Sequence, residues 1–250
     1  MTAPAAGTPA TGAAPFPRVE VRPALPPLGA DDVLVVPVGA RGALPAWLTH
    51  PHPSTPAPVD ADLLAGALAG TGNGGRPGGV TAVPLPGGRP RAVLAVGIGD
   101  ATLPHLRSYI AVAVRRAQAL AEHGARRLVL PLDDEAAPAG AEEVRAAVET
   151  ALLAGYRFRT TSTAHPARLA EVVVVLSDAT DPAAAAAAAA GQVAAESTAW
   201  ARDLVNTPPD VADPAWLAGQ AQARLGARDG VTVTVPVSYT HLTLPTILRV

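Results

Sequence analysis

The sequence predicts an α/β fold with a mixed, largely parallel sheet flanked by helices. Short runs rich in valine and leucine alternate along the chain with longer segments whose apolar residues recur at helical spacing. The clearest run, Val172-Val173-Val174-Val175-Leu176, lacks polar alternation, as expected for a strand covered on both faces. Two earlier runs flank Gly87-Gly88 and predict an antiparallel hairpin, which makes the sheet mixed.

The first part of the chain has few large apolar side chains that could form a core. Residues 1–30 are rich in Ala, Pro, Gly and Thr, so we predict a disordered leader there. The first strand is expected at residues 33–38. Closely spaced prolines predict an extended loop at residues 49–58, because each proline denies helical geometry to the residue before it. Residues 72–79 predict an irregular glycine-rich loop that is poorly suited to a precise site.

From residue 80 onward the predicted elements follow one another regularly. Asp181-Pro182 and Asp213-Pro214 are good helix openings, and Pro208-Pro209 prevents a helix from continuing. In chain order we predict strands at 80–86 and 92–98, a helix at 103–122, a strand at 128–132, a helix at 141–153, a strand at 172–176, helices at 183–205 and 214–225, and a strand at 231–235. One α/β domain therefore occupies residues 31–205.

Composition excludes several kinds of chemistry. The chain has 19 basic and 21 acidic residues and no cysteine, and every basic residue is arginine. It therefore lacks a Schiff-base or P-loop lysine, a thiolate nucleophile and Cys-ligated metals. A net charge of −2 without a basic stripe argues against nucleic-acid binding. Neither a secretory signal nor an apolar segment long enough to span a membrane is apparent. We therefore predict a cytoplasmic protein that does not bind membranes.

Two local patterns suggest ligand sites but have simpler interpretations. Gly97-Ile98-Gly99 follows a strand and precedes a helix, as in dinucleotide-binding turns. The third glycine is missing and Asp100 would repel a pyrophosphate, so we interpret the pattern as a strand-to-helix turn. His50 and His52 could ligate a metal, but no carboxylate is near them in sequence, and we interpret them as solvated loop histidines.

The other candidate residues form no self-contained site. Asp133-Asp134-Glu135 follows a strand end, where α/β proteins often bind ligands, but adjacent loop carboxylates are usually just solvated. The remaining candidates are isolated histidines, and serines outside any Gly-x-Ser-x-Gly elbow: His105, His123, His165, Ser162 and Ser177. We therefore predict no catalytic, metal-binding or cofactor-binding residue in this chain.

Two stretches resemble the leucyl aminopeptidase (cytosol aminopeptidase) family. The first runs from Glu149 through Leu152-Leu153 to Tyr156-Arg157-Phe158. The second is Ala201-Arg202-Asp203-Leu204-Val205-Asn206-Thr207-Pro208-Pro209, followed by Asp213-Pro214-Ala215-Trp216-Leu217-Ala218, where the family usually has Thr-Pro. In that family an Arg-Asp-Leu-x-Asn-x-Pro element joins a macro-like N-terminal α/β domain to the catalytic domain. The resemblance covers residues 30–235.

The resemblance implies a parent protein that is a hexameric hydrolase. It would release N-terminal residues, leucine among the favoured ones, from peptides with the help of two divalent metals, manganese or zinc. The family's metal-binding motifs contain lysines and lie downstream of the linker, and none is present here. We therefore expect an inactive N-terminal fragment. The alternative is a stand-alone macro-like module that binds ADP-ribose or a similar ligand.

The resemblance also divides the C-terminal part of the chain. We expect residues 206–236 to form the linker and the truncated start of the catalytic domain. Residues 237–250 are rich in Thr and Leu, unlike the Ala/Arg/Gly background, and we predict that they form a non-native tail.

Overall fold

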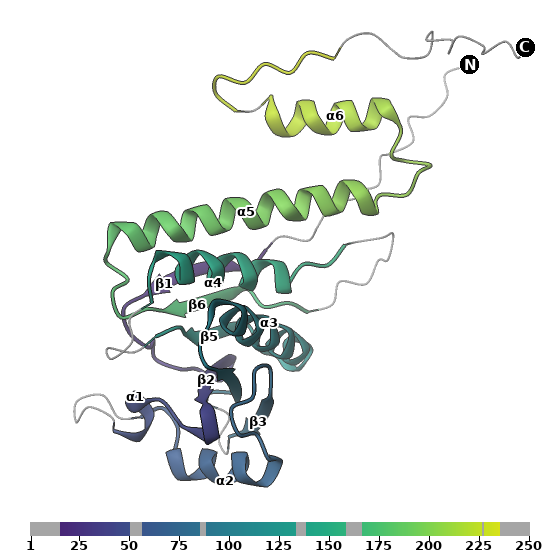
Figure 1. The fold of residues 1–250 in the computed structure, drawn as a ribbon. Helices are drawn as coiled ribbons and strands as arrows, with labels where there is room; N and C mark the ends of the chain where they lie inside the picture. The colour runs from purple at the N-terminus through teal and green to yellow at the C-terminus, as the bar shows by residue number, and fades with distance from the viewer. Residues whose placement is uncertain are drawn as a thin grey trace, which may run out of the picture. The chain divides into compact units, whose positions relative to one another are not determined.

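The computed structural model describes residues 16–50, 57–85, 89–133, 139–158, 167–226 and 228–235. Contacts divide the chain into two units, Met1–Trp200 and Ala201–Val250. The first unit holds the sheet and the helices that cover it (Figure 1). Within the described part of the chain, no helix has both the length and the apolar character needed to cross a bilayer.

A six-stranded mixed sheet forms the centre of the first unit. Its strand order is β1-β6-β5-β2-β4-β3, and only the pairing of β3 with β4 is antiparallel. The strands are β1 (Arg18–Arg22), β2 (Asp32–Gly39), β3 (Val80–Pro84), β4 (Ala92–Gly99), β5 (Arg127–Pro131) and β6 (Glu171–Val175). This architecture confirms the predicted fold class.

Helices cover both faces of the sheet (Figure 1). One face packs against α1 (Ala46–Thr49) and α2 (Ala61–Thr71), and the other against α3 (Leu103–Leu120) and α4 (Ala141–Ala154). The central strand β2 is buried on both sides, because Val33 and Val35 join the α3 cluster whereas Leu34 and Val36 join the α2 cluster. This two-sided burial explains its continuous apolar sequence.

The long helix α5 (Pro182–Asn206) packs against α4 through small residues. A Cβ atom built on Gly191 would lie 2.6 Å from the Arg145 carbonyl oxygen and 3.2 Å from the Val148 Cβ. The missing side chain therefore lets the two helix backbones approach closely. The buried residues of α5 recur every three or four positions: Ala184, Ala187, Gly191, Ala195 and Ala199.

The disordered leader predicted for residues 1–30 is wrong at residues 18–22, which form β1 and pair in parallel with β6. Val19 and Val21 pack against the cluster on the α3 side of the sheet. The charged residues Arg18, Glu20 and Arg22 alternate with them and point to the other side. This alternation is the strand signal that the low content of large apolar residues obscured.

One further prediction differs from the structure, and one long helix was not predicted. Residues 231–235, predicted as a strand, have no strand structure, because alternation alone does not form a strand without a neighbouring one. Helix α2 was not predicted. Asp60 caps its N-terminus by accepting hydrogen bonds from the amides of Asp62 and Leu63, and the left-handed Gly72 caps its C-terminus.

Most other elements match their predictions to within a few residues, including α6 (Pro214–Leu225). The predicted hairpin is confirmed by the antiparallel pairing of β3 with β4. Its turn at Gly87-Gly88 lies outside the described residues, as do residues 51–56 of the predicted proline-rich loop and the proposed tail at 237–250.

The glycine-rich loop at residues 72–79 has no regular secondary structure, as predicted, but part of it is closely packed. The buried Asn73 donates hydrogen bonds to the Thr81 hydroxyl (3.2 Å) and the Ala95 carbonyl (3.3 Å). Its own side-chain oxygen accepts from the Gly75 amide at 3.3 Å. Gly75 adopts φ +82°, and a Cβ atom built on it would lie 1.8 Å from the Gly39 carbonyl oxygen. The loop therefore rests directly on the backbone at the end of β2.

Replacing Gly75 with alanine should destabilise the domain. The new methyl group would overlap the Gly39 carbonyl and force a side chain into a left-handed conformation. We expect the free energy of unfolding, measured by urea denaturation, to fall by about 2–4 kcal/mol.

Gly66→Ala is the matched control, because no atom lies within 4 Å of a Cβ built at this position in α2. It should leave stability unchanged or raise it by up to about 1 kcal/mol. Equal effects of the two substitutions would show that the loop is not packed as described.

Candidate functional site

Charged residues of alternating sign lie side by side where four neighbouring strands begin. The strand register pairs Arg18 with Glu171, Glu171 with Arg127, and Arg127 with Asp32. Cross-strand neighbours of opposite charge stabilise a sheet, so this charge row favours the observed register. Beside it lies an open hollow of about 370 Å³, lined by Asp31, Asp32, Arg126, Arg127, Ala170 and Glu171.

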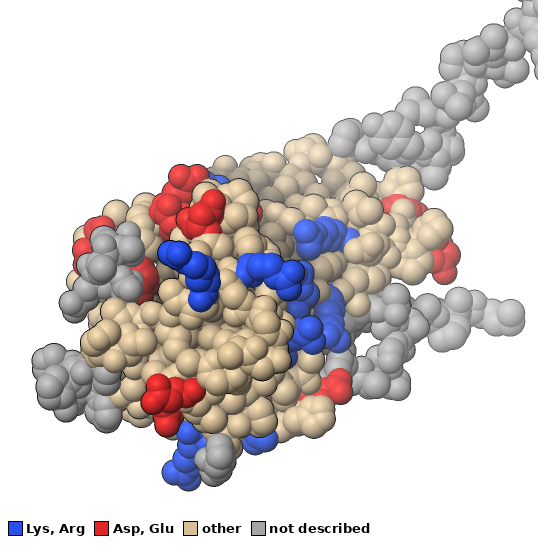
Figure 2. Space-filling view, turned by 60° about the horizontal axis from the view of Figure 1, so that its bottom comes forward, with Lys and Arg blue, Asp and Glu red and all other residues tan. Residues whose placement is uncertain are grey.

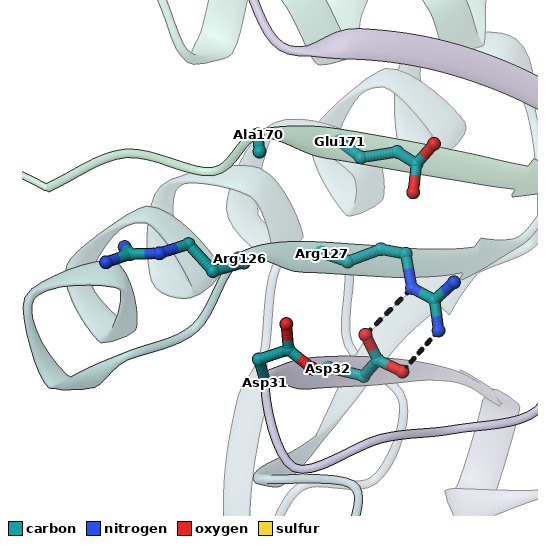
Figure 3. A pocket seen from close by; sticks show the side chains of 6 residues that line it. All are labelled: Asp31, Asp32, Arg126, Arg127, Ala170 and Glu171. Atoms are coloured by element: carbon teal, nitrogen blue, oxygen red, sulfur yellow. Dashed lines mark hydrogen bonds and ion pairs between the residues drawn. The ribbon is translucent and has the colours of Figure 1, made fainter.

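The ion pair between Asp32 and Arg127 is the most buried part of the charge row (Figure 3). Asp32 is 1% exposed, and its two carboxylate oxygens accept from Arg127 Nε at 2.8 Å and Nη2 at 2.5 Å. The Gly29 amide donates to the same carboxylate at 2.6 Å, and Arg127 also donates to the Pro27 carbonyl at 2.9 Å. The hydrogen bond to Asp32 raises the pKa of Arg127.

The residues that line the hollow hold neighbouring strands together. Its buried carboxylate is already satisfied by Arg127 and Gly29. Arg126 points away from the other lining side chains and donates to the carbonyls of Ala121 and Ala125, just beyond the C-terminal end of α3 (Figure 3). Ligands of open α/β sheets usually bind at the carboxyl ends of the strands, whereas this hollow lies at their amino ends.

At the carboxyl end of β4, backbone fills the turn that suggested a dinucleotide site. A Cβ built on Gly97 would lie 2.1 Å from the Arg76 carbonyl oxygen, and one on Gly99 would lie 2.7 Å from Pro77 Cγ. The Gly99 amide donates to the Gly75 carbonyl at 3.0 Å. Both glycines are therefore required by the neighbouring loop, which supports their interpretation as a strand-to-helix turn.

Asp100 and His105 form a hydrogen-bonded pair beside this turn. Asp100 Oδ1 accepts from His105 Nδ1 and also from the Thr102 hydroxyl at 3.1 Å. These hydrogen bonds, chiefly the one from His105, hold the pKa of Asp100 below its ordinary value. Both side chains are partly exposed, and the pair ties the end of β4 to the first turn of α3.

The other predicted candidates are not brought together. Asp133 accepts from the Ser177 amide (2.8 Å) and hydroxyl (3.0 Å) and from the Ala139 amide (2.7 Å), so it links the ends of β5 and β6. His50 is exposed beside the Thr49 hydroxyl, and His123 is exposed after α3. The rest lie outside the described residues: His52, Asp134, Glu135, Ser162 and His165.

Among the residues that the structure describes, no group of three His, Asp or Glu side chains could hold a metal ion. The described residues therefore do not fit a metal centre.

Sequence reasoning missed the charge row. A usable signal exists, because a charged residue directly precedes the apolar runs of β2, β5 and β6, and Arg18 begins β1. Which of these residues become neighbours follows from the spatial order of the strands, β1-β6-β5-β2, and this order is not visible along the chain.

Comparison with known proteins identifies the family to which this domain is similar. Residues 59–165 match the model of the cytosol aminopeptidase family, N-terminal domain. A probable cytosol aminopeptidase from Stenotrophomonas maltophilia (strain K279a) is 30% identical over 212 residues, covering 80% of this chain and 42% of that protein. The chain thus spans less than half the length of this relative.

Two solved structures are similar to this chain over most of its length. The bottromycin maturation enzyme BotP is 34% identical with a TM-score of 0.56, covering 78% of this chain and 37% of that one. A mutant of tomato leucine aminopeptidase has a TM-score of 0.65 at 19% identity, covering 86% and 44%, and shows the shared fold alone.

The α/β domain is thus of the type found at the N-terminus of cytosol aminopeptidases. It is the N-terminal domain of the cytosol aminopeptidase family, which confirms the resemblance found in the sequence.

Removing the buried carboxylate of the ion pair should destabilise the domain. In Asp32→Asn, Arg127 and the Gly29 amide lose their charged acceptor. Because Arg127 keeps some solvent access, we expect a loss of about 2–3 kcal/mol in urea denaturation. Asp31→Asn, at an exposed neighbour, should change stability by less than about 0.5 kcal/mol. A smaller effect at Asp32 than at Asp31 would refute the structural role of the pair.

The pKa of Asp100 should depend on His105. In His105→Ala, the main hydrogen bond that lowers this pKa is lost, so the pKa should rise toward its ordinary value. Carboxyl-carbon NMR titration of Asp100 in both proteins measures the change. An unchanged Asp100 titration would mean that the pair does not form in solution.

Proposed function

We propose that this chain serves as the N-terminal domain of a metal-dependent aminopeptidase that releases N-terminal residues, leucine among them, from peptides. The observation that carries the proposal is the match of the α/β domain to the N-terminal domain of the cytosol aminopeptidase family. The 30% identity to a probable cytosol aminopeptidase over 80% of this chain supports it.

The chemistry would be performed by a part of the parent protein that has no counterpart in the described residues. More than half of the Stenotrophomonas relative is not matched by this chain. We propose that this unmatched part binds two divalent metals, manganese or zinc, and a structure of BotP in complex with Mn supports the metal dependence. Such metals polarise the scissile carbonyl and activate a water molecule.

The described residues would then support catalysis without taking part in it. At the amino end of the sheet, the charges of Asp32 and Arg127 satisfy each other. At the carboxyl end, backbone of the glycine-rich loop covers the turn at Gly97. Beside this turn, Asp100 and His105 are hydrogen-bonded to each other, as are Asp133 and Ser177 at the ends of β5 and β6. We therefore propose a structural role for the domain. We also propose a cytoplasmic homohexamer for the parent protein.

A second candidate function is that of a maturation enzyme such as BotP, to which this chain is 34% identical. Binding of ADP-ribose by a stand-alone module receives no comparable support, since the Arg76 carbonyl occupies the space that a phosphate would need above Gly97.

The proposal can be tested with a fusion protein. Residues 16–235 of this chain would replace the matched segment of the Stenotrophomonas aminopeptidase. We expect the fusion to release leucine from a leucyl dipeptide in the presence of Mn²⁺, because the domain replaces its own homologue. The 250-residue chain alone should release none at equal concentration, measured by amino-acid analysis.

Two results would contradict the proposal. One is metal-dependent turnover by the 250-residue chain itself. The other is a folded fusion that has no activity although the unaltered relative is active under the same conditions. Turnover of a panel of longer peptides but of no dipeptide would favour the maturation enzyme.

A further inference from the structure

Asn73 and Gly74 form a chemically reactive dipeptide in the glycine-rich loop. An asparagine side chain can lose its amide nitrogen when the backbone nitrogen of the next residue attacks its Cγ atom. Glycine permits this attack best, because it has no side chain to hinder the approach. The other asparagine of the chain, Asn206, is followed by the β-branched Thr207. Asn73 is therefore the more reactive of the two by sequence.

The closed loop engages every polar atom of the Asn73 side chain. Nδ2 donates to the Thr81 hydroxyl and to the Ala95 carbonyl, and Oδ1 accepts from the Gly75 amide. The residue is only 8% exposed. Both hydrogen bonds of Nδ2 must break before this nitrogen can leave, and water must reach a buried site. The closed loop therefore opposes the reaction that the dipeptide favours.

The attacking nitrogen is held as well. The Gly74 amide donates to the Gly72 carbonyl at 3.0 Å, and it must give up its proton to become a nucleophile. Gly74 itself is exposed, and its backbone does not adopt the left-handed conformation. A Cβ atom built on it meets no described atom within 4 Å. The packing of the described loop therefore does not require glycine at this position.

We propose that Asn73 is a site of spontaneous deamidation, and that the closed loop confines the reaction to molecules in which the loop has opened. The Gly74 nitrogen loses its proton and forms a bond to Asn73 Cγ. The bond from Cγ to Nδ2 then breaks, and the nitrogen leaves as ammonia with that proton. Water opens the resulting succinimide ring at either carbonyl, which yields aspartate or isoaspartate. The reaction consumes one water and releases one ammonia, so its balance requires no oxidant or other reactant.

The products keep the loop from closing. A carboxylate at position 73 cannot donate to the Ala95 carbonyl, and the closed loop would bury it against that oxygen. Isoaspartate also lengthens the main chain, which displaces Gly75 from its close contact with the Gly39 carbonyl. A transient opening of the loop is thus converted into a covalent change that refolding does not reverse.

Incubation of the 250-residue chain at mildly alkaline pH, followed by proteolysis and peptide mass spectrometry, tests the proposal. Asn73 should convert to a mixture of aspartate and isoaspartate. Conversion should be about a hundredfold slower in the folded chain than in the urea-unfolded chain, because it must wait for local opening. Asn206 should remain unconverted over the same period, and it serves as the internal control.

Two variants separate the chemistry of the dipeptide from the opening of the loop. Thr81→Val removes one acceptor of the Asn73 amide, so conversion should accelerate about tenfold in the folded chain and stay unchanged in urea. Gly74→Ala adds a methyl group for which the loop has room. It should keep the stability of the domain but slow conversion about tenfold in both states, because the methyl group hinders the attack. Gly66→Ala, outside the loop, should change neither rate.

Asn73→Asp supplies the aspartate product directly. The Gly99 amide donates to the Gly75 carbonyl at 3.0 Å, so its hydrogen exchange reports whether the loop is closed. We expect this amide to exchange about tenfold faster in Asn73→Asp than in the unaltered chain. Amides within α3 should exchange equally slowly in both proteins, which shows that the domain is folded.

Four results would each overturn the proposal. Equal conversion rates in the folded and unfolded chains, or no acceleration in Thr81→Val, would show that the loop does not control the reaction. Conversion in urea without any in folded Thr81→Val would show that the loop does not open far enough. Unchanged exchange of the Gly99 amide in Asn73→Asp would contradict the effect of the product on the loop.

Discussion

The start of the central strand β2 holds the first unit together at the amino end of its sheet. The Asp32 carboxylate binds Arg127 of β5 and the Gly29 amide, and the Asp32 carbonyl accepts from the Arg91 amide at 2.8 Å just before β4. One residue thus joins both neighbouring strands and the preceding turn. Since β2 is buried on both faces, its position determines where the helices on either side can pack.

The two ends of the sheet are stabilised by different physics. Paired charges organise the amino end, whereas the carboxyl end is closed by backbone packed against backbone at Gly75 and Gly97. On the face drawn in Figure 2, several arginines lie near one another beside a broad uncharged area, with acidic groups mostly around its margin.

Local signals predicted most of this fold. Apolar periodicity located β2, β5, β6 and α3 because burial on known faces imposes a spacing on the sequence. It failed at β1, whose alternating charges resemble solvated chain, and at residues 231–235, where a strand pattern has no neighbour. The surroundings of the candidate site residues could not be predicted from the sequence. Whether Gly97 faces a phosphate or a carbonyl depends on a loop that precedes it by twenty residues, and the partner of Asp32 is 95 residues away.

The placement of β1 has a consequence for folding during synthesis. Arg18 pairs with Glu171, so about 150 further residues must be synthesised after β1 before its partner strand exists. Until then the valines of β1 have no sheet to join. The sheet can assemble from β2 to β6 as those strands emerge, and β1 completes it last, along the edge that β6 provides. Early synthesis of β1 is thus followed by late incorporation.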